Sequence, residues 1–401
     1  MKKYSKEWDV IIPPWNVIIP PYVRGLTFDG VKGLFVHTEP VSGDTAVEAD
    51  LVIETAGYNP ADSGDVKTLL KLVEKKFTEY AAKTAQYPGT ILLDSERIIR
   101  IGKDYAQSVT DADCSVAPGT KGSESRSDVV RGKIALVTGG AQGFGEGMVT
   151  ELAGAGAFVY IADMNFSGAQ KLADSLNMDA GTVIAKALEV NVTSDESVAA
   201  MMESVALETG GLDLFISNAG VLKAGSVKDM ELKDFNFVTS VDYTGFFLCT
   251  KYASRLLAYQ NAAAKEYMTD IIGISSKSGL EGSNKNGAYA GAKFGTIGLT
   301  QSFALELVTD NIKVNAICPG NFLDGPLWSD PDRGLFVQYL HTGKVPGAKT
   351  IEDVRKFYEA KVPLNRGCKT IDVIKAVFYI VEQQYETGQA VPVTGGQVML
   401  N

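Results

Sequence analysis

Residues 134–145 read Ile-Ala-Leu-Val-Thr-Gly-Gly-Ala-Gln-Gly-Phe-Gly. The apolar run at 134–137 predicts a buried strand, and the glycines after it predict a tight turn into a helix over about 146–155. Such glycines let the backbone approach a pyrophosphate, and the start of the helix supplies N–H donors and partial positive charge. A single glycine-rich turn is as often only a tight loop, so the hypothesis of a nucleotide site depends on the sequence around it.

Three further apolar runs, at 158–162, 182–187 and 212–216, continue a strand-turn-helix rhythm. Polar residues that follow such strands lie beside the ligand crevice of an open parallel sheet. Asp163 comes 24 residues after Gly139, where a carboxylate accepts the hydroxyls of an adenosine ribose and repels a 2′-phosphate. Because no Arg or Lys follows it directly, the sequence favours NAD over NADP.

A second polar stretch, 275–293, carries the candidate catalytic side chains. Tyr289 and Lys293 are four residues apart, so they share one face of a predicted helix. A nearby ammonium lowers the pKa of a phenol from its ordinary value near ~10, which makes Tyr289 a candidate general acid and base. Ser276 follows a predicted strand and could hydrogen-bond the same substrate oxygen. A Tyr-x-x-x-Lys pair alone is usually a solvated helix face, so Ser276 and the nucleotide motifs are needed to favour catalysis.

Together these motifs resemble the short-chain dehydrogenase/reductase family over residues 131–401. The resemblance rests on Thr-Gly-x-x-x-Gly-x-Gly at 138–145, Asn-Ala-Gly at 218–220, Ser276 with Tyr289 and Lys293, and Pro-Gly at 319–320. It implies a Rossmann-type doubly wound parallel sheet, a Ser-Tyr-Lys catalytic set and bound NAD. The cofactor contacts that it implies are Thr138, Gly139, Gln142, Gly143, Phe144, Gly145, Asp163, Asn191, Val192, Asn218, Ala219, Gly220, Tyr289, Lys293, Pro319, Gly320 and Asn321.

Asp242 departs from the family pattern, which usually has Asn at this position to hold a proton-relay water. Its backbone carbonyl could keep that water, while its carboxylate would change the pH dependence. A buried structural Asp or a helix-cap Asp is an equally good interpretation. We therefore treat Asp242 as a fourth candidate catalytic residue.

Several C-terminal segments are similar to the sorbitol-6-phosphate 2-dehydrogenase group of the family, among them 276–279, 289–295, 361–368 and 393–399. The similarity implies reversible, NAD-dependent oxidation of D-sorbitol 6-phosphate to D-fructose 6-phosphate, with hydride transfer at C2. One alternative is a dehydrogenase of another polyol or sugar phosphate, since one pocket contact can change the substrate. Another is a non-catalytic NAD-sensing regulatory protein, against which the intact Ser-Tyr-Lys set argues.

A phosphorylated substrate needs local cations, because the chain has a net charge of −10. Lys223 and Lys277, with Ser278, follow predicted strands and are the candidate substrate residues, and Lys285 is a weaker one. For each lysine, a solvated surface charge is an equally good interpretation. The insertion at 321–361 is long enough to form a substrate lid.

Residues 1–115 predict a small α+β domain of unknown role, and the small, polar residues at 116–130 predict a linker. The pattern indicates an extended piece at 17–19 beside two prolines, a helix at 65–83, and a hairpin from 90–94 and 97–101. This region resembles the end of a class II aldolase domain, as in sugar-phosphate aldolase and dehydrogenase fusions. Those aldolases hold zinc with clustered histidines, so a region with only His37 implies a lost metal.

The 401 residues have a pI of about 5.0, which offers no basic field for nucleic acid or an anionic membrane. Four scattered cysteines without a C-x-x-C pair indicate reduced thiols, and two distant histidines make a metal site improbable. No signal peptide and no run of 18 apolar residues is evident, so we expect a cytoplasmic protein. The family resemblance further suggests a homotetramer.

Overall fold

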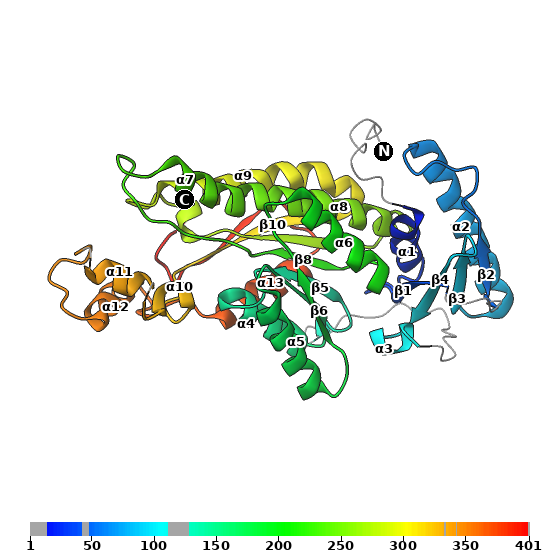
Figure 1. Cartoon of the computed structure of the whole chain (residues 1–401), viewed down its shortest axis with the longest axis horizontal. Coiled ribbons are helices and arrows are strands. Elements are labelled where there is room, and N and C mark those ends of the chain that lie inside the picture. The colour runs from blue at the N-terminus through cyan, green and yellow to red at the C-terminus, as the bar shows by residue number, and fades with distance from the viewer. Residues whose placement is uncertain (1–13, 42–47, 111–127, 333, 342, 400–401) are drawn as a thin grey trace.

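The structure is a computed structural model that describes residues 14–41, 48–110, 128–332, 334–341 and 343–399. These residues form a four-stranded sheet in the order β1-β4-β3-β2 and a seven-stranded sheet in the order β11-β10-β9-β8-β5-β6-β7. The small sheet lies at one end of the long axis, and helices α10–α12 lie at the other (Figure 1). Residues 116–127 of the predicted linker lie outside the described residues.

The seven-stranded sheet is parallel between every pair of neighbours. Its central strands are buried along their whole length, as a sheet covered on both faces requires. The sheet confirms the predicted Rossmann-type, doubly wound fold. Its strands are β5 Ile134–Thr138, β6 Phe158–Asp163, β7 Ala185–Glu189, β8 Leu214–Ser217, β9 Thr269–Ile274, β10 Ile312–Pro319 and β11 Ala390–Val393.

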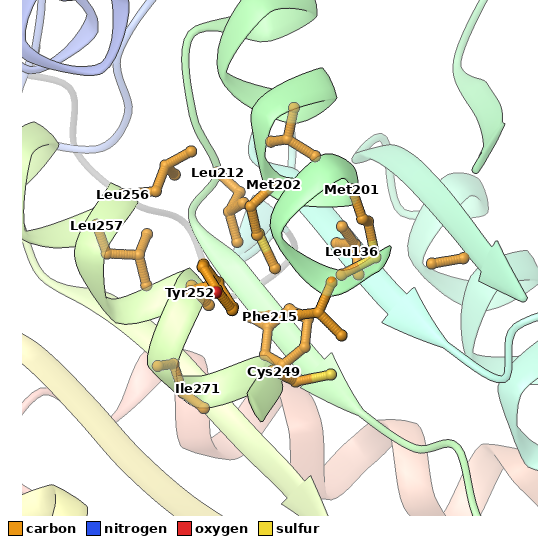
Figure 2. Packing of buried hydrophobic residues seen from close by; sticks show 14 of the residues in the cluster. Leu136, Met201, Met202, Leu212, Phe215, Cys249, Tyr252, Leu256, Leu257 and Ile271 are labelled. Atoms are coloured by element: carbon orange, nitrogen blue, oxygen red, sulfur yellow. The ribbon is translucent and has the colours of Figure 1, made fainter. Parts of the chain in front are cut away.

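Helices cover both faces of this sheet. One face packs against α6 (Asp195–Thr209), α8 (Gly245–Ala262) and α9 (Gly287–Leu307). The other packs against α4 (Gly143–Gly154), α5 (Phe166–Ala180) and α13 (Thr370–Glu382). Figure 2 shows the first core, where Leu136 and Phe215 of the sheet face Met202 of α6 and Cys249 of α8. Among the helices that the structure describes, none is long and apolar enough to cross a membrane.

The remaining elements belong to an N-terminal unit, defined here as the described part of residues 14–110, and to segments that connect the strands and helices of the large sheet. The N-terminal unit has α1 Trp15–Leu26, β1 Phe35–Pro40, β2 Leu51–Ile53, α2 Ser63–Thr84, β3 Thr90–Leu93, β4 Arg97–Gly102 and α3 Tyr105–Ser108. The other segments are α7 Leu232–Thr239, η2 Ser240–Thr244, η3 Lys277–Gly279, η4 Val308–Asp310, α10 Pro326–Ser329, α11 Leu335–His341 and α12 Ile351–Glu359. Helices α10–α12 fall within residues 321–361, which we call the cap.

The N-terminal unit confirms the predicted helix and hairpin, since α2 spans 63–84 and β3 pairs antiparallel with β4. The prediction of an extended piece at 17–19 is wrong, because these residues lie in helix α1. Pro20 and Pro21 sit inside this helix and remove two backbone donors. Packing outweighs that cost: Ile18 and Ile19 are fully buried, and α1 lies against α8 and α6.

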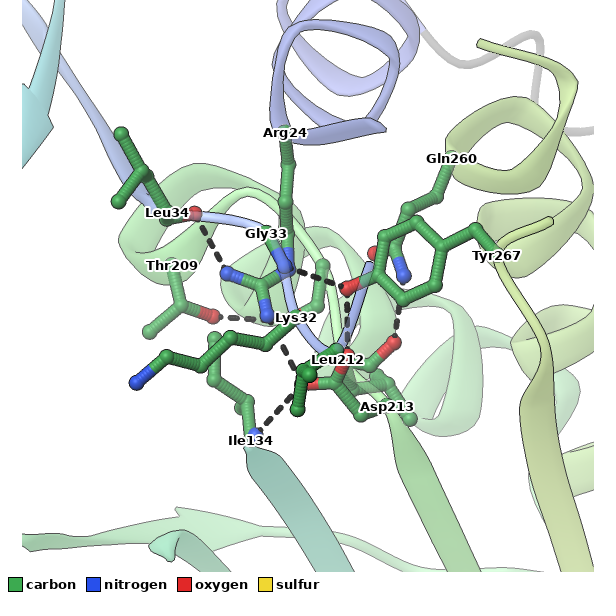
Figure 3. Close-up of polar contacts among 12 residues, drawn as sticks. Arg24, Lys32, Gly33, Leu34, Ile134, Thr209, Leu212, Asp213, Gln260 and Tyr267 are labelled. Carbon is green, nitrogen blue, oxygen red and sulfur yellow. Dashed lines mark hydrogen bonds and ion pairs between the residues drawn. The ribbon is translucent and has the colours of Figure 1, made fainter. Parts of the chain in front are cut away.

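A buried polar network joins the N-terminal unit to the large sheet (Figure 3). Arg24 of α1 donates from Nη2 to Asp213 Oδ2 at 2.8 Å, and Ile134 N donates to the same oxygen at 2.7 Å. The Tyr267 hydroxyl donates to Asp213 Oδ1 at 2.5 Å and accepts the N–H of Gly33 at 3.1 Å. Asp213 and Ile134 stand at the starts of β8 and β5, so the N-terminal unit covers the amino ends of the strands. It therefore lies away from the ligand crevice of its own chain, which is at their carboxyl ends.

Candidate active site

The glycine-rich turn between β5 and α4 has the shape that a dinucleotide phosphate requires. Gly139 and Gly143 have φ of 63° and 62°, a region that favours glycine. A Cβ on Gly145 would lie 1.9 Å from the carbonyl oxygen of Gly139, so only glycine fits there. Gln142 makes no side-chain cap to α4, which leaves its first N–H groups for a ligand. These residues fit the pyrophosphate of a nicotinamide dinucleotide.

Thr138 and Asn218 hold two of the predicted cofactor loops together. The Oγ1 of Thr138 accepts the backbone N–H of Asn218 at 3.0 Å and that of Ala219 at 3.2 Å. In return Nδ2 of Asn218 donates to the carbonyl oxygens of Thr138 and Gly139, both at 3.0 Å. Thr138 is fully buried, so its side chain positions the loops. Contact between these residues and the cofactor stays a prediction.

Asp163 ends β6 beside the glycine-rich turn. Its Oδ2 accepts the N–H of Ala141 at 3.0 Å, and its Oδ1 accepts that of Asn165 at 2.8 Å. Asp163 is half-buried at the carboxyl end of β6, and its contact with the cofactor ribose stays a prediction. Further along the same edge, the side chain of Asn191 turns back to Thr193, and Val192 is buried.

The predicted Pro319, Gly320 and Asn321 follow β10 and begin the cap. The Gly320 N–H donates to Val393 at 2.9 Å, which ties this turn to β11. The next residue, Phe322, stacks on Phe144 with ring centroids 4.5 Å apart. This contact joins the cap to the glycine-rich turn. No sequence pattern marked Phe322, because a stacking partner is set only by the tertiary fold.

The structure brings Ser276, Tyr289 and Lys293 together at the carboxyl end of β9. The Ser276 hydroxyl faces Tyr289 and lowers the pKa of its phenol. The Nζ of Lys293 lies 5.5 Å from the centroid of the Tyr289 ring and donates to the carbonyl oxygen of Ile274 at 3.0 Å. Lys293 is 4% exposed, so its ammonium is fixed beneath the phenol, as the spacing predicts. The arrangement can pass a proton to or from an oxygen placed against Ser276 and Tyr289.

Asp242 reaches the same centre from the π-helical turn η2. One carboxylate oxygen, Oδ1, accepts the N–H of Val221 at 2.7 Å, and Oδ2 lies 3.5 Å from Lys293 Nζ. Oδ2 is buried and has no hydrogen-bond partner among the described residues. The backbone carbonyl of Asp242, the expected site of a relay water, accepts the Thr296 hydroxyl at 3.3 Å. Asp242 therefore meets Lys293, a candidate catalytic residue, directly through its carboxylate.

The pKa of Tyr289 differs from the expectation. Burial raises the pKa of the phenol, and the nearby Asp242 carboxylate raises it too, while Lys293 and the hydrogen bond from Ser276 lower it. The result is a pKa above the ordinary value, so the predicted lowering is wrong for this structure. Burial lowers the pKa of Lys293, but Asp242 and Tyr289 raise it more, which keeps the ammonium charged.

The candidate substrate residues divide into two groups. Lys277 and Ser278 lie in η3, directly after Ser276, and Ser278 is buried. Lys223 is half exposed and forms an ion pair with Asp234 at 3.0 Å, so its charge is already compensated. In the described parts of the chain, no group of three or more His, Cys, Asp or Glu could hold a metal ion.

The family model described as short chain dehydrogenase matches residues 133–329. Sorbitol-6-phosphate 2-dehydrogenase of Escherichia coli (strain K12) is 36% identical over 270 residues, which are 67% of this chain and 99% of that protein. A 3-oxoacyl-[acyl-carrier-protein] reductase of Aquifex aeolicus is 29% identical over 67% of this chain and 98% of its own length. The crystal structure of sorbitol-6-phosphate 2-dehydrogenase from Erwinia amylovora superposes with a TM-score of 0.61 at 38% identity, over 66% of this chain and 100% of that one. With the parallel sheet and the Ser-Tyr-Lys site, these similarities show that the chain belongs to the short-chain dehydrogenase/reductase family, whose members are oxidoreductases that use NAD or NADP.

Proposed function

We propose that this chain is an NAD-dependent dehydrogenase that reversibly oxidises D-sorbitol 6-phosphate to D-fructose 6-phosphate. The observation that carries the proposal is the set of Ser276, Tyr289 and Lys293 at the carboxyl end of β9. The choice of substrate is supported by the 36% identity to the Escherichia coli enzyme over 99% of that protein.

In the proposed mechanism, deprotonated Tyr289 accepts the proton of the C2 hydroxyl. Ser276 hydrogen-bonds the same oxygen and steadies the charge that develops on it. Lys293 stays beneath the phenol, held by Ile274 and Asp242. NAD, when bound, supplies the acceptor for the hydride that leaves C2. Ketone reduction uses the same groups in reverse, with Tyr289 as the acid.

The preference for NAD is also part of the proposal. Asp163 would hold the adenosine ribose, the turn at 139–145 the pyrophosphate, and Lys293 the nicotinamide ribose. The half-buried carboxylate of Asp163 supports NAD over NADP, because its charge would repel a 2′-phosphate.

The experiment is a spectrophotometric assay of NADH formation. It compares D-sorbitol 6-phosphate with other polyol phosphates and with free D-sorbitol, each with NAD and with NADP. We expect the highest kcat/KM for D-sorbitol 6-phosphate with NAD. Faster oxidation of another polyol phosphate would show that D-sorbitol 6-phosphate is not the preferred substrate. Binding of NADH without any turnover would favour the NAD-sensing alternative.

We further propose that the protein is a homotetramer. Helices α7, α8 and α9 expose aromatic side chains that a second copy could cover: Phe235, Phe237, Phe247 and Phe294 are 44%, 48%, 43% and 46% exposed. The N-terminal unit meets α8 near Gln260, at the other end of that helix. Light scattering should give four times the chain mass, and Phe247→Lys should lower the measured mass.

A further inference from the structure

Four lysines lie in segments that follow the carboxyl ends of β9 and β10: Lys277, Lys285, Lys344 and Lys361. Two come from the segment between β9 and α9, and two come from the cap. Within the part of the chain that the structure describes, none of the four has a carboxylate oxygen within 4.0 Å. This differs from Lys223, whose charge Asp234 already compensates. We call these four residues the lysine quartet.

The first pair is fixed beside the catalytic centre. Lys277 begins η3 and is the residue after Ser276, the partner of Tyr289. The backbone carbonyl of Lys285 accepts the N–H of Gly225 at 2.9 Å, which pins its loop to the segment after β8. Both lysines therefore belong to loops whose positions are set by the sheet.

The second pair is carried by the aromatic core of the cap. Lys344 Nζ lies 3.8 Å from the centroid of the Tyr339 ring, and Lys361 Nζ lies 5.1 Å from that of Tyr358. These two rings stack 5.5 Å apart, so the same aromatic core carries both ammonium groups. Leu222, after β8, packs against the same core and places the cap next to the loop that carries Lys285.

The four charges are close enough to repel one another. Burial lowers the pKa of Lys344, and Lys361, Lys285 and Lys277 lower it further. Burial and Lys361 also lower the pKa of Lys277, against an opposite effect of Glu281. An anion bound beside these lysines would relieve their mutual repulsion.

We propose that the lysine quartet is the subsite for the phosphate group of the substrate, formed half by the loop before α9 and half by the cap. The inference rests on the proposed function, because the phosphate must belong to a molecule oxidised at Tyr289. A phosphate monoester has three strong acceptor oxygens and binds ammonium groups through charge-assisted hydrogen bonds. The phosphate of D-sorbitol 6-phosphate is on C6, four bonds from the reacting C2. The quartet therefore holds the far end of the substrate, and the cap closes over the substrate by binding that phosphate.

The test replaces the cap lysines one at a time, as Lys344→Gln and Lys361→Gln. Each should raise KM for D-sorbitol 6-phosphate by roughly tenfold, the loss expected for one charge-assisted contact. For free D-sorbitol, kcat/KM should change by less than about twofold, since no phosphate is present. Lys349→Gln is the matched control, because Lys349 is an exposed cap lysine outside the quartet. Equal losses on both substrates, or an equal loss in Lys349→Gln, would overturn the subsite.

Calorimetric titration separates this inference from the proposed function. D-sorbitol 6-phosphate and inorganic phosphate are each titrated into the NADH-bound wild-type protein and the two cap variants. If the wild type oxidises phosphorylated polyols and the variants bind them unchanged, the subsite is wrong and the function stands. If no phosphate ester is oxidised but phosphate binds and the variants lose that binding, the function is wrong and the anion site stands.

Discussion

Buried carboxylates at the two ends of the seven-stranded sheet differ in how completely they are hydrogen-bonded. At the amino ends, both oxygens of Asp213 accept hydrogen bonds, from Arg24, Tyr267 and the N–H of Ile134. At the carboxyl ends, Asp242 uses one oxygen for Val221, while the other faces Lys293 at 3.5 Å without a hydrogen bond. The first carboxylate joins two parts of the chain, and the second lies against Lys293, the proposed partner of Tyr289.

This difference indicates which charges serve stability and which serve chemistry. A buried ionised group is tolerated when its partners are complete, as at Asp213. Incomplete partners leave a group able to change its protonation or to bind a ligand, as at Tyr289, Asp242 and the lysine quartet. Substitutions at the amino ends should therefore change folding, and those at the carboxyl ends should change turnover.

Tyr289→Phe should have the largest effect on activity. The change removes the only hydroxyl proposed to exchange a proton with the substrate and little contact surface. We expect kcat to fall by about a thousandfold, within the usual range for a lost general acid or base. Binding of NADH, followed by fluorescence, should be unchanged. Substantial remaining turnover would contradict the assignment of Tyr289.

Arg24→Met should have the largest effect on stability. It leaves Asp213 buried without its cationic partner, so we expect the free energy of unfolding to fall by about 3–5 kcal/mol. Arg131→Met is the control, because Arg131 is 63% exposed where it pairs with Asp128 and should contribute less than about 1 kcal/mol. Denaturant unfolding measures both. Folded Arg24→Met protein should keep the KM of the wild type. A changed KM with unchanged stability would contradict the view that charges at the amino ends serve folding and not turnover.

The parts of the molecule that the sequence predicted are those fixed by short-range geometry. Gly139 and Gly143 need a left-handed backbone, and the spacing of Tyr289 and Lys293 puts both on one helical face. The helix and hairpin of the N-terminal unit also follow from local periodicity.

Other features depend on contacts between distant segments and left no local signal. Helix α1 forms despite Pro20 and Pro21, because α8 and α6 bury its apolar side chains. Lys344 and Lys361 influence Lys277 and one another only through the tertiary fold, since they are more than 60 residues further along the chain than Lys277. The pKa of Tyr289 was mispredicted because its burial and its distance to Asp242 are properties of the tertiary structure.

Asp163→Ala should change cofactor preference at the carboxyl end without changing folding. Loss of the proposed ribose contacts should raise KM for NAD by roughly tenfold, while KM for NADP should rise less or fall. Steady-state kinetics with both cofactors measures the ratio, and thermal unfolding checks that Tm is maintained. An unchanged ratio would count against the ribose contact.

Asp242→Asn should have the smallest effect on rate and a specific effect on pH dependence. Oxidation needs deprotonated Tyr289, so its rate rises with pH through the pKa of that phenol. Burial raises this pKa, Asp242 raises it too, and Lys293 and Ser276 oppose them. A neutral amide removes the contribution of Asp242, so the rising limb of kcat/KM should move to lower pH. Asp179→Asn, an exposed change of the same charge on α5, should leave the profile in place. If Asp242 is only structural, its variant should lose stability and keep the wild-type profile.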